Sequence, residues 1–176
     1  GAGTGYGLAY AIWSGTEYQV IAGEGGHAGF SPANEIQAAL WHDIAGREGR
    51  VSVEHVVSGP GILRIYEFMK RTQGIPESPR VRADLRAGAG PDAISRHAFE
   101  HGDPLALVSL DLFVQCYGAA AGDNALCLGT RGGVFIAGGI AAKLPRKFAD
   151  GSFITAFNAK GPHSTLMARI PVHVVT

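Results

Sequence analysis

The chain has 176 residues, of which 46% are hydrophobic and 17% are charged, a composition typical of one globular domain that can bury a sizeable core. Its 15 lysines and arginines balance 15 aspartates and glutamates, and no dense basic run occurs, so nucleic-acid binding has no electrostatic support. No apolar run reaches the roughly 18 uninterrupted residues of a membrane span, so we expect no membrane partner.

The glycines and cysteines add two expectations. The 26 glycines fall in short, separated clusters, which indicates loops between regular elements and not a disordered tract. The only two cysteines, Cys116 and Cys127, lie in apolar surroundings without CxxC spacing. We therefore expect two buried free thiols in a reducing compartment, the cytoplasm.

A β-hairpin is predicted near the start of the chain. Two β-prone runs, residues 6–13 and 17–22, are joined by Ser14-Gly15-Thr16, which favours a tight turn. The stretch before them, Gly1-Ala2-Gly3-Thr4-Gly5, is typical of a turn, and a turn normally connects two elements. We therefore expect the chain to be a fragment of a longer protein.

Helices are predicted next. Residues 34–48 have apolar side chains at helical spacing, and either Ser31 or Asn34 can cap their start. Residues 52–61 predict a short turn or helix broken by glycine and proline. Residues 62–71 predict a helix with one buried face.

The second half of the chain is expected to centre on one buried helix. Residues 73–90, with their prolines and arginines, predict a surface connection with little regular structure, and residues 92–101 predict a modest helix. Asp103 and Pro104 are typical of a helix N-terminus. Residues 105–126 are apolar on most sides, which indicates a central, buried helix.

The end of the chain returns to strands. Residues 134–137 predict a short buried strand, which two glycines separate from a helix over residues 140–148. An irregular or weakly helical stretch leads to a last strand near Val172. The order of hairpin, helices, strand, helix and strand predicts an α/β fold.

The stretch Gly23-Glu24-Gly25-Gly26-His27 is the first candidate binding site. It holds a carboxylate, which accepts hydrogen bonds, and an imidazole, which can donate or accept, in a loop that glycines make flexible. Such a pair suits sugar hydroxyls, and Glu54 could join it in one cleft. The competing interpretation is a glycine-rich hairpin end with two polar residues on the surface.

A zinc site is a weaker interpretation of the same region. His27, Glu54 and His55 could be three ligands, but their spacing lacks a helical H-x-x-x-H pair and a cysteine partner, so we expect no metal site. Asp111 is expected to bond to a neighbouring helix or to backbone. The remaining histidines considered are expected to be ordinary surface or capping residues: His42, His97, His101 and His163.

Two glycine-rich segments could approach a nucleotide. The first, Gly1-Ala2-Gly3-Thr4-Gly5-Tyr6-Gly7, offers backbone N–H groups and a hydroxyl to phosphate oxygens, and it matches neither the dinucleotide fingerprint nor a Walker loop. Its alternative is a plain turn. The second, Gly138-Gly139, stands between a predicted strand and a predicted helix, where it favours either nucleotide approach or close strand–helix packing.

Four motifs occur in an order that resembles one known family. They are Gly3-Thr4-Gly5-Tyr6-Gly7, Gly23-Glu24-Gly25-Gly26-His27, Val56-Val57-Ser58-Gly59-Pro60-Gly61 and Leu128-Gly129-Thr130-Arg131-Gly132-Gly133-Val134-Phe135-Ile136-Ala137-Gly138-Gly139-Ile140. Together they resemble the bacterial ATP-dependent glucokinases that are distinct from the zinc-carrying ROK sugar kinases. No cysteine-rich zinc loop follows His27, which agrees with that branch.

The resemblance implies the actin/hexokinase/Hsp70 superfold, in which two α/β ribonuclease-H-like domains close over sugar and ATP. Residues 1–176 would be most of the large C-terminal domain of a two-domain sugar kinase, and the small N-terminal domain and the final helix would be absent. The resemblance also implies a homodimer.

The same resemblance implies roles for single residues. Those that would contact glucose hydroxyls are Glu24, His27 and Glu54. Those that would approach ATP, which arrives with Mg²⁺, are Gly3, Thr4 and Gly5 at the phosphates and Gly138 and Gly139 near the adenosine.

Two parts of the family pattern are missing from the sequence. These are the first phosphate loop, of the Asp-x-Gly-Gly-Thr type, and the aspartate that acts as general base on the sugar 6-hydroxyl. We therefore expect the parent protein to phosphorylate glucose to glucose 6-phosphate and this chain to be inactive alone. The alternative is a non-catalytic sugar-binding or regulatory module on the same fold. A third option is a structural half that only mediates dimerisation.

Overall fold

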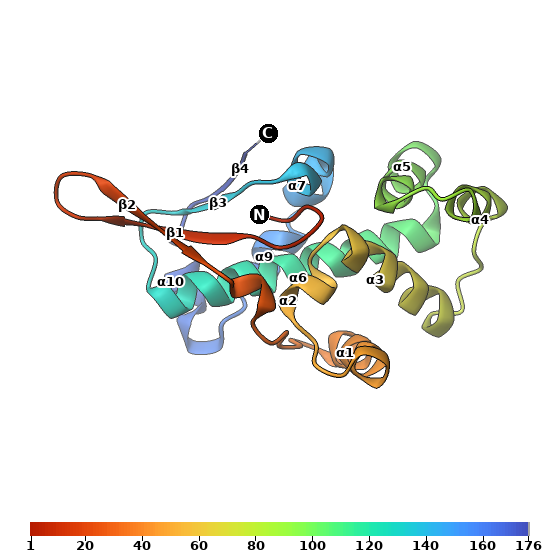
Figure 1. Cartoon of the computed structure of the whole chain (residues 1–176), viewed down its shortest axis with the longest axis horizontal. Coiled ribbons are helices and arrows are strands. Elements are labelled where there is room, and N and C mark those ends of the chain that lie inside the picture. The colour runs from red at the N-terminus through yellow and green to blue at the C-terminus, as the bar shows by residue number, and fades with distance from the viewer. Residues whose placement is uncertain (176) are drawn as a thin grey trace.

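The computed structural model describes residues 1–175 and is organised around one long helix, α6 (Pro104–Leu128). The Asp103 side chain accepts a hydrogen bond from the Ala106 amide at 2.9 Å, and Pro104 occupies the first turn, as predicted. By length and composition α6 could cross a membrane, but most of its apolar window is buried inside this protein. Other helices surround it (Figure 1), so α6 is the core helix of the domain.

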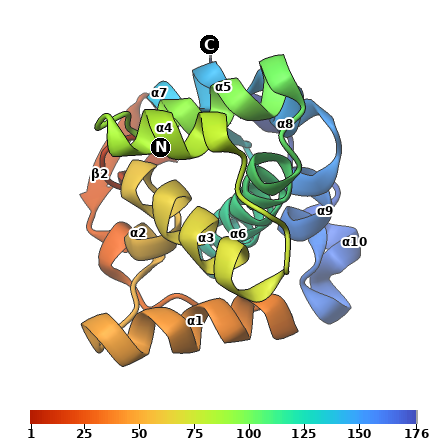
Figure 2. The same ribbon diagram turned by 90° about the vertical axis from the view of Figure 1, so that its right-hand side faces the viewer.

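The helices that precede α6 pack on one side of it and on one another. Figure 2 shows α1 along one edge of this group, α4 and α5 along the opposite edge, and α3 in the middle; α3 and α5 both contact α6. The bounds of these helices are α1 Glu35–Glu48, α2 Val53–Val56, α3 Gly59–Thr72, α4 Pro79–Arg86 and α5 Pro91–His101.

Capping residues explain where two of these helices start. The Asn34 side chain accepts from the Gln37 amide at 3.0 Å, which selects Asn34 over Ser31 as the cap of α1. The Ser58 hydroxyl accepts from the Gly61 amide at 3.0 Å, so α3 begins at Gly59, three residues before the predicted start.

The predicted surface connection over residues 73–90 is wrong, because it contains helix α4. Ser78 caps the helix by accepting from the Val81 amide at 3.4 Å, and Pro79 stands at its first position, where a proline favours a helix. Val81 is fully buried, which anchors α4 to the core. The proline that suggested a break therefore marks a helix start.

One histidine expected at the surface is buried. His97 on α5 is 4% exposed, and its Nε2 lies 2.8 Å from Oδ2 of Asp84 on α4. Arg96 donates to the same oxygen at 2.6 Å. His97 therefore helps to join α4 to α5, while His42, His101 and His163 are exposed as expected.

The helices that follow α6 are short and pack on its other side. Their bounds are α7 Gly139–Lys143, α8 Pro145–Ala149, α9 Ser152–Asn158 and α10 Ser164–Met167, with a 3-10 turn, η2, at Gly161–His163. The single helix predicted over residues 140–148 is thus two helices, which are separated at Leu144 before Pro145 because proline ends a helix. Lys147 on α8 pairs with Asp111, which confirms the expected bond to a neighbouring helix.

Helix α9 lies very close to α6. A Cβ atom added to Gly118 would lie 2.3 Å from the Phe153 carbonyl oxygen, and one added to Gly122 would lie 2.4 Å from that of Phe157. Glycine is therefore required at both positions of α6 for this contact.

The expectation of two buried free thiols is half right, since Cys116 on α6 is buried and Cys127 is exposed.

In residues 1–175 the strands form two separate two-stranded sheets. The predicted hairpin is present: β1 (Leu8–Trp13) pairs antiparallel with β2 (Tyr18–Gly23), with Leu8 opposite Gly23. The two late strands, β3 (Val134–Ile136) and β4 (Val172–Val174), pair in parallel. Both sheets lie at the same end of the molecule (Figure 1), and the mixture of strands and helices confirms the α/β class.

Candidate functional site

The glycine-rich start of the chain forms a closed loop that leads into β1. The Gly1 ammonium donates to the Gly7 carbonyl at 2.6 Å, and the Gly7 amide donates to the Gly1 carbonyl at 2.8 Å. Between them Ala2 faces Tyr6 in an antiparallel bridge, and the Gly3 amide donates to the Gly5 carbonyl at 2.8 Å. The segment from Gly1 to Gly7, which we call the N-terminal loop, is therefore a tight antiparallel turn with exposed Thr4 at its tip.

Three other parts of the chain hold the N-terminal loop in place. The Tyr117 hydroxyl on α6 accepts from the Ala2 amide at 3.1 Å, and Glu54 Oε2 on α2 accepts from the Tyr6 amide at 2.8 Å. The Gly59 amide, at the start of α3, donates to the Gly3 carbonyl at 2.8 Å. These contacts fix the loop relative to the helical core.

The loop is also tied down by its own tyrosine. Tyr6 is 8% exposed, and its hydroxyl accepts a hydrogen bond from the Asn124 side chain on α6 at 3.3 Å. Burial raises the pKa of the Tyr6 phenol to about 12, so the group stays neutral near pH 7. Burial raises the pKa of Tyr117 as well, and its ring packs edge-on against that of Tyr6, with centroids 5.8 Å apart.

The second glycine-rich segment lies against the N-terminal loop. A Cβ atom added to Gly138 would lie only 2.5 Å from the Ala2 carbonyl oxygen, and Gly138 has a φ of 105°, so glycine is needed there on two counts. Ala137 is close as well, because a Cβ atom added to Gly1 would lie 2.7 Å from its carbonyl oxygen. The two segments predicted to approach a nucleotide are thus neighbours in space.

The acid–imidazole stretch lies on another side of the same loop. It ends in a 3-10 turn, η1 (Gly25–His27), where Glu24 Oε2 and His27 Nε2 are 3.9 Å apart and their side chains are 92% and 63% exposed. A Cβ atom added to Gly26 would lie 2.3 Å from the Tyr6 carbonyl oxygen. The turn η1 therefore contacts the residue whose amide is bound by Glu54, and α2 packs against η1.

His55, one of the three residues of the zinc interpretation, has other partners in the structure. His55 Nδ1 accepts from the Ser52 amide at 2.9 Å, and its Nε2 lies 3.4 Å from Glu48 on α1. His55 is therefore engaged at the start of α2 and with α1. Among residues 1–175, no three histidine, cysteine, aspartate or glutamate side chains are grouped so that they could hold a metal ion.

The sequence did not single out several residues that build this region. Tyr117 and Asn124 belong to no motif, because each acts through a contact with a segment far away in the chain. Gly59 belongs to the motif over residues 56–61, but nothing in that motif predicts its contact with Gly3. A glycine next to a helix start is the only sequence signal that could have indicated it.

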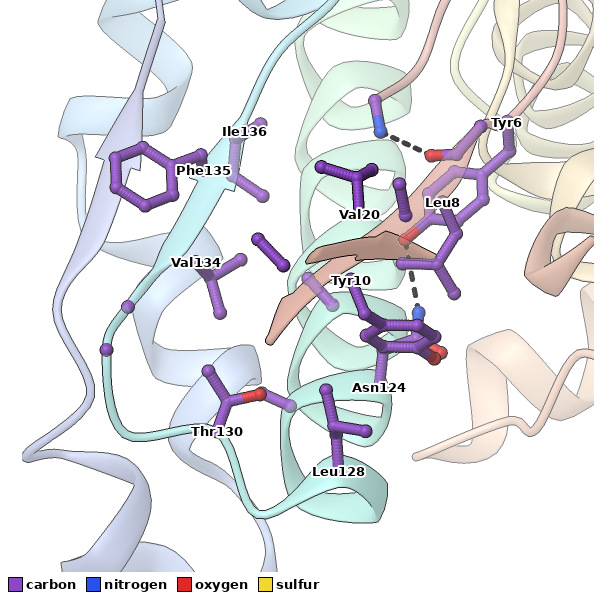
Figure 3. A pocket seen from close by; sticks show the side chains of 18 of the residues that line it. Tyr6, Leu8, Tyr10, Val20, Asn124, Leu128, Thr130, Val134, Phe135 and Ile136 are labelled. Carbon is purple, nitrogen blue, oxygen red and sulfur yellow. Dashed lines mark hydrogen bonds between the residues drawn. The ribbon is translucent and has the colours of Figure 1, made fainter. Parts of the chain in front are cut away.

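One cavity is also new and is distinct from the predicted binding residues. It has a volume of about 680 Å³ and lies between β1 and β3, over the second half of α6 (Figure 3). Its walls include Tyr10, Val20, Asn124, Leu128 and Phe135. None of the eight residues expected to contact sugar or nucleotide lines it.

Comparison with known proteins identifies the family. The glucokinase family model matches residues 1–176. The glucokinase of a Nostoc species is 41% identical over 192 residues, covering 99% of this chain and 55% of that protein. The glucokinase of Mesorhizobium japonicum is 35% identical over 176 residues, covering 100% of this chain and 49% of that protein.

Solved structures agree. The crystal structure of a glucokinase from an Antarctic psychrotroph matches with a TM-score of 0.85 and 31% identity, covering 99% of this chain and 52% of that one. A glucokinase from Balamuthia mandrillaris, solved in complex with glucose, matches with a TM-score of 0.79 over 98% of this chain and 48% of that one. At 21% identity the second match supports the fold alone. The chain spans about half the length of the relatives it matches, and it belongs to the glucokinase family.

Proposed function

We propose that this chain is most of the large C-terminal domain of a two-domain glucokinase, built on the ribonuclease-H-like fold of the actin/hexokinase/Hsp70 superfold. The whole protein would transfer the γ-phosphoryl group of MgATP to the 6-hydroxyl of glucose. The family match over residues 1–176 supports this activity. The coverage of about half of each relative supports the division into two domains.

One observation carries the proposal at the level of residues. The candidate sugar-binding and nucleotide-binding segments all contact the N-terminal loop. Glu54 binds the Tyr6 amide and η1 packs on the Tyr6 carbonyl, while Gly138 packs on Ala2. Phosphoryl transfer depends mainly on positioning, so a shared support for both substrates is what the reaction requires.

The sugar side of the loop has suitable chemistry. Glu24 supplies an acceptor and His27 supplies a group that can donate or accept, and both are exposed. The Tyr6 amide fixes Oε2 of Glu54, which leaves Oε1 to accept from a sugar hydroxyl. Sugar hydroxyls both donate and accept, so these three side chains would bind and orient glucose.

The other side of the loop has suitable chemistry for phosphates. Thr4 is exposed and adds a hydroxyl to the backbone N–H groups at the tip of the loop. A Cβ atom added to Gly3 or to Gly139 would meet no atom within 4 Å, so a ligand has room beside both. Mg²⁺ would arrive with the nucleotide, be held largely by phosphate oxygens and neutralise charge during transfer.

The chain by itself is expected to be inactive. In the family that it resembles, the general base is an aspartate of the small N-terminal domain, and this chain offers no replacement for it. Glucose 6-phosphate formation from glucose and MgATP should therefore be measured with the full-length protein and with residues 1–176 alone. Turnover by the full-length protein only is the expected result. A full-length protein that binds glucose without turnover would favour the non-catalytic sugar-binding module.

The sugar site can be tested separately by calorimetric titration of D-glucose into the chain. Saturable binding is expected, with loss in Glu24→Gln and in Glu54→Gln. The matched control is Glu17→Gln, which removes an exposed carboxylate at the far end of the hairpin. L-Glucose, which has the same composition and the wrong geometry, should not bind. Equal binding by all three variants would refute the assignment of Glu24 and Glu54.

We also propose that the full-length protein is a cytoplasmic homodimer. The unpaired thiols of Cys116 and Cys127 support a reducing compartment. The dimer rests on the family resemblance. Light scattering of the full-length protein at two concentrations should give twice the mass of one chain, and a single-chain mass would contradict it.

A further inference from the structure

The segment before α2 pairs with the segment that directly follows η1. Two backbone hydrogen bonds, of 2.9 and 3.0 Å, join the outer residues of segments 28–30 and 51–53. Between these bonds Ser52 faces Gly29 in an antiparallel bridge. A residue in that place points its own N–H and C=O groups away from the paired segment. Ser52 is 5% exposed, so its amide needs a partner inside the protein.

His55, on α2, supplies that partner. Its Nδ1 accepts a hydrogen bond from the Ser52 amide at 2.9 Å. His55 stands three residues after Ser52, where the glutamate or glutamine of a capping box binds the same amide. A ring nitrogen that accepts a hydrogen bond carries no proton, so the imidazole that makes this contact is neutral and has its proton on Nε2.

The helix that His55 holds in place carries Glu54 and supports the other candidate sugar ligands. Glu54 Oε2 accepts from the Tyr6 amide at 2.8 Å. Helix α2 also packs against η1, the turn that bears His27 and follows Glu24. A shift at the start of α2 would therefore reach all three side chains proposed to bind glucose.

Charged groups from two other helices face His55. Glu48 Oε2, at the end of α1, lies 3.4 Å from Nε2 of the ring. Arg64 on α3, which lies beside α2 (Figure 1), donates to Glu48 at 2.9 Å and to the His55 carbonyl at 3.4 Å. A second proton on the ring would sit on Nδ1 and oppose the Ser52 N–H, while the new charge would be attracted to Glu48. The charged ring therefore cannot keep its contact with the Ser52 amide.

We propose that His55 is a positioning residue of the glucose site, which it holds in its binding form only while its imidazole is neutral. Loss of the Ser52 contact releases the start of α2 and moves Glu54, so the affinity for glucose falls when the ring gains a proton. Histidine is the side chain that ordinarily changes charge between about pH 5 and pH 8. The inference rests on the glucose site proposed above, and it adds a dependence of that site on pH.

The test is calorimetric titration of D-glucose into the full-length protein between pH 8 and pH 5.5. His55→Gln keeps an acceptor for the Ser52 amide and gains no proton, so at pH 8 its Kd should lie within about twofold of the wild type. His55→Ala leaves the buried amide without a partner and should bind about tenfold more weakly. At pH 5.5 the Kd of the wild type should have risen about tenfold more than that of His55→Gln. Any change that both proteins share belongs to other groups, including His27.

Two controls separate positioning from general damage. His42→Gln makes the same chemical change at an exposed histidine of α1 and should follow the wild type at every pH. With saturating MgATP, His55→Ala should raise the KM for glucose and leave kcat within about twofold, because it weakens a contact that binds the substrate. A fall in kcat without a change in KM would overturn the positioning role.

The contact itself can be followed without a ligand. In residues 1–176 the Ser52 amide proton should move upfield in the NMR spectrum as the pH falls from 8 to 5.5, since it loses its acceptor, and should move less in His55→Gln. A Ser52 resonance that stays constant in the wild type would overturn the proposal.

The binding data distinguish this proposal from the proposed function. Parallel pH curves for the wild type and His55→Gln, or wild-type affinity in His55→Ala, would overturn the role of His55 and leave the glucose site standing. A wild-type protein that binds no glucose at any pH would overturn the proposed function, and the role of His55 with it.

Discussion

The helices around α6 bury their apolar side chains far more completely than the strands do. Leu110, Phe113 and Tyr117 on α6 are 0% exposed, whereas Trp13 and Val20 in the hairpin are 56% and 72% exposed. A helix satisfies its backbone hydrogen bonds internally and has only to bury one or more faces. A strand needs neighbours for its backbone as well as for its side chains. Within residues 1–175, the apolar side chains of the helical part are therefore covered more completely than those of the hairpin.

The largest change in the free energy of unfolding is expected at the centre of α6. Phe113→Ala should lower the free energy of unfolding by about 3–5 kcal/mol, since it leaves a cavity among fully buried neighbours. Val20→Ala in β2 should change it by less than about 0.5 kcal/mol, because that side chain is mostly exposed. Urea unfolding followed by circular dichroism measures both. Similar losses for the two variants would show that the hairpin contributes to the same core.

A smaller effect is expected where α9 lies close to α6. Gly118→Ala should destabilise the protein by about 1–3 kcal/mol, because the added methyl group would meet the Phe153 carbonyl oxygen. Gly46→Ala is the matched control, since its methyl group on α1 would meet nothing within 4 Å. That change should stabilise the protein by about 0.5–1 kcal/mol through helix propensity. Two variants of the same sign would contradict the close packing of α6 and α9.

The sequence predicted those elements that are marked by local signals. Helix α6 was predicted because Asp103 and Pro104 mark its start and an almost continuous apolar run follows. The hairpin was predicted because two β-prone runs flank a glycine turn. Helix α4 was missed because its proline was interpreted as a break, although Ser78 before it is a cap. The local signals of a helix start are present there, but a proline is compatible both with a break in structure and with the first turn of a helix.

The candidate site likewise contains residues that the sequence indicates and contacts that it does not. The acid and imidazole of the Glu24–His27 pair were recognisable because residue types and spacing indicate the chemistry. The hydrogen bonds that hold the site in place were not recognisable from the sequence. Tyr117 bonds to a backbone amide 115 residues away, and Glu54 bonds to one 48 residues away. A backbone amide is the same at almost every residue, so no sequence pattern predicts such a contact. The cavity between β1 and β3 depends on how two sheets are placed, which local propensity does not determine.

The smallest predicted effect concerns the junction of α4 and α5 and tests whether the helical part is held by charge as well as by burial. Hydrogen bonds from His97 and Arg96 hold the pKa of Asp84 below its ordinary value of 3.8. The folded protein therefore binds fewer protons at this site than the unfolded chain does. The carboxylate contributes stability that is fully present above pH 3.8 and is lost as the pH falls through the lowered pKa.

The measurement is the urea midpoint of the wild type and of Asp84→Asn between pH 2 and pH 6. The wild type should be the more stable at pH 6, and the difference should shrink as Asp84 is protonated at low pH. Because the Asp84 side chain is 38% exposed, solvent and salt screen its interactions, so the difference should also narrow in 1 M sodium chloride. Glu100→Gln, an exposed change on α5, provides the control and should give a curve that parallels the wild type. A constant difference between the wild type and Asp84→Asn at every pH would mean that α4 is held on α5 by Val81 and other apolar contacts, without help from the ionised carboxylate.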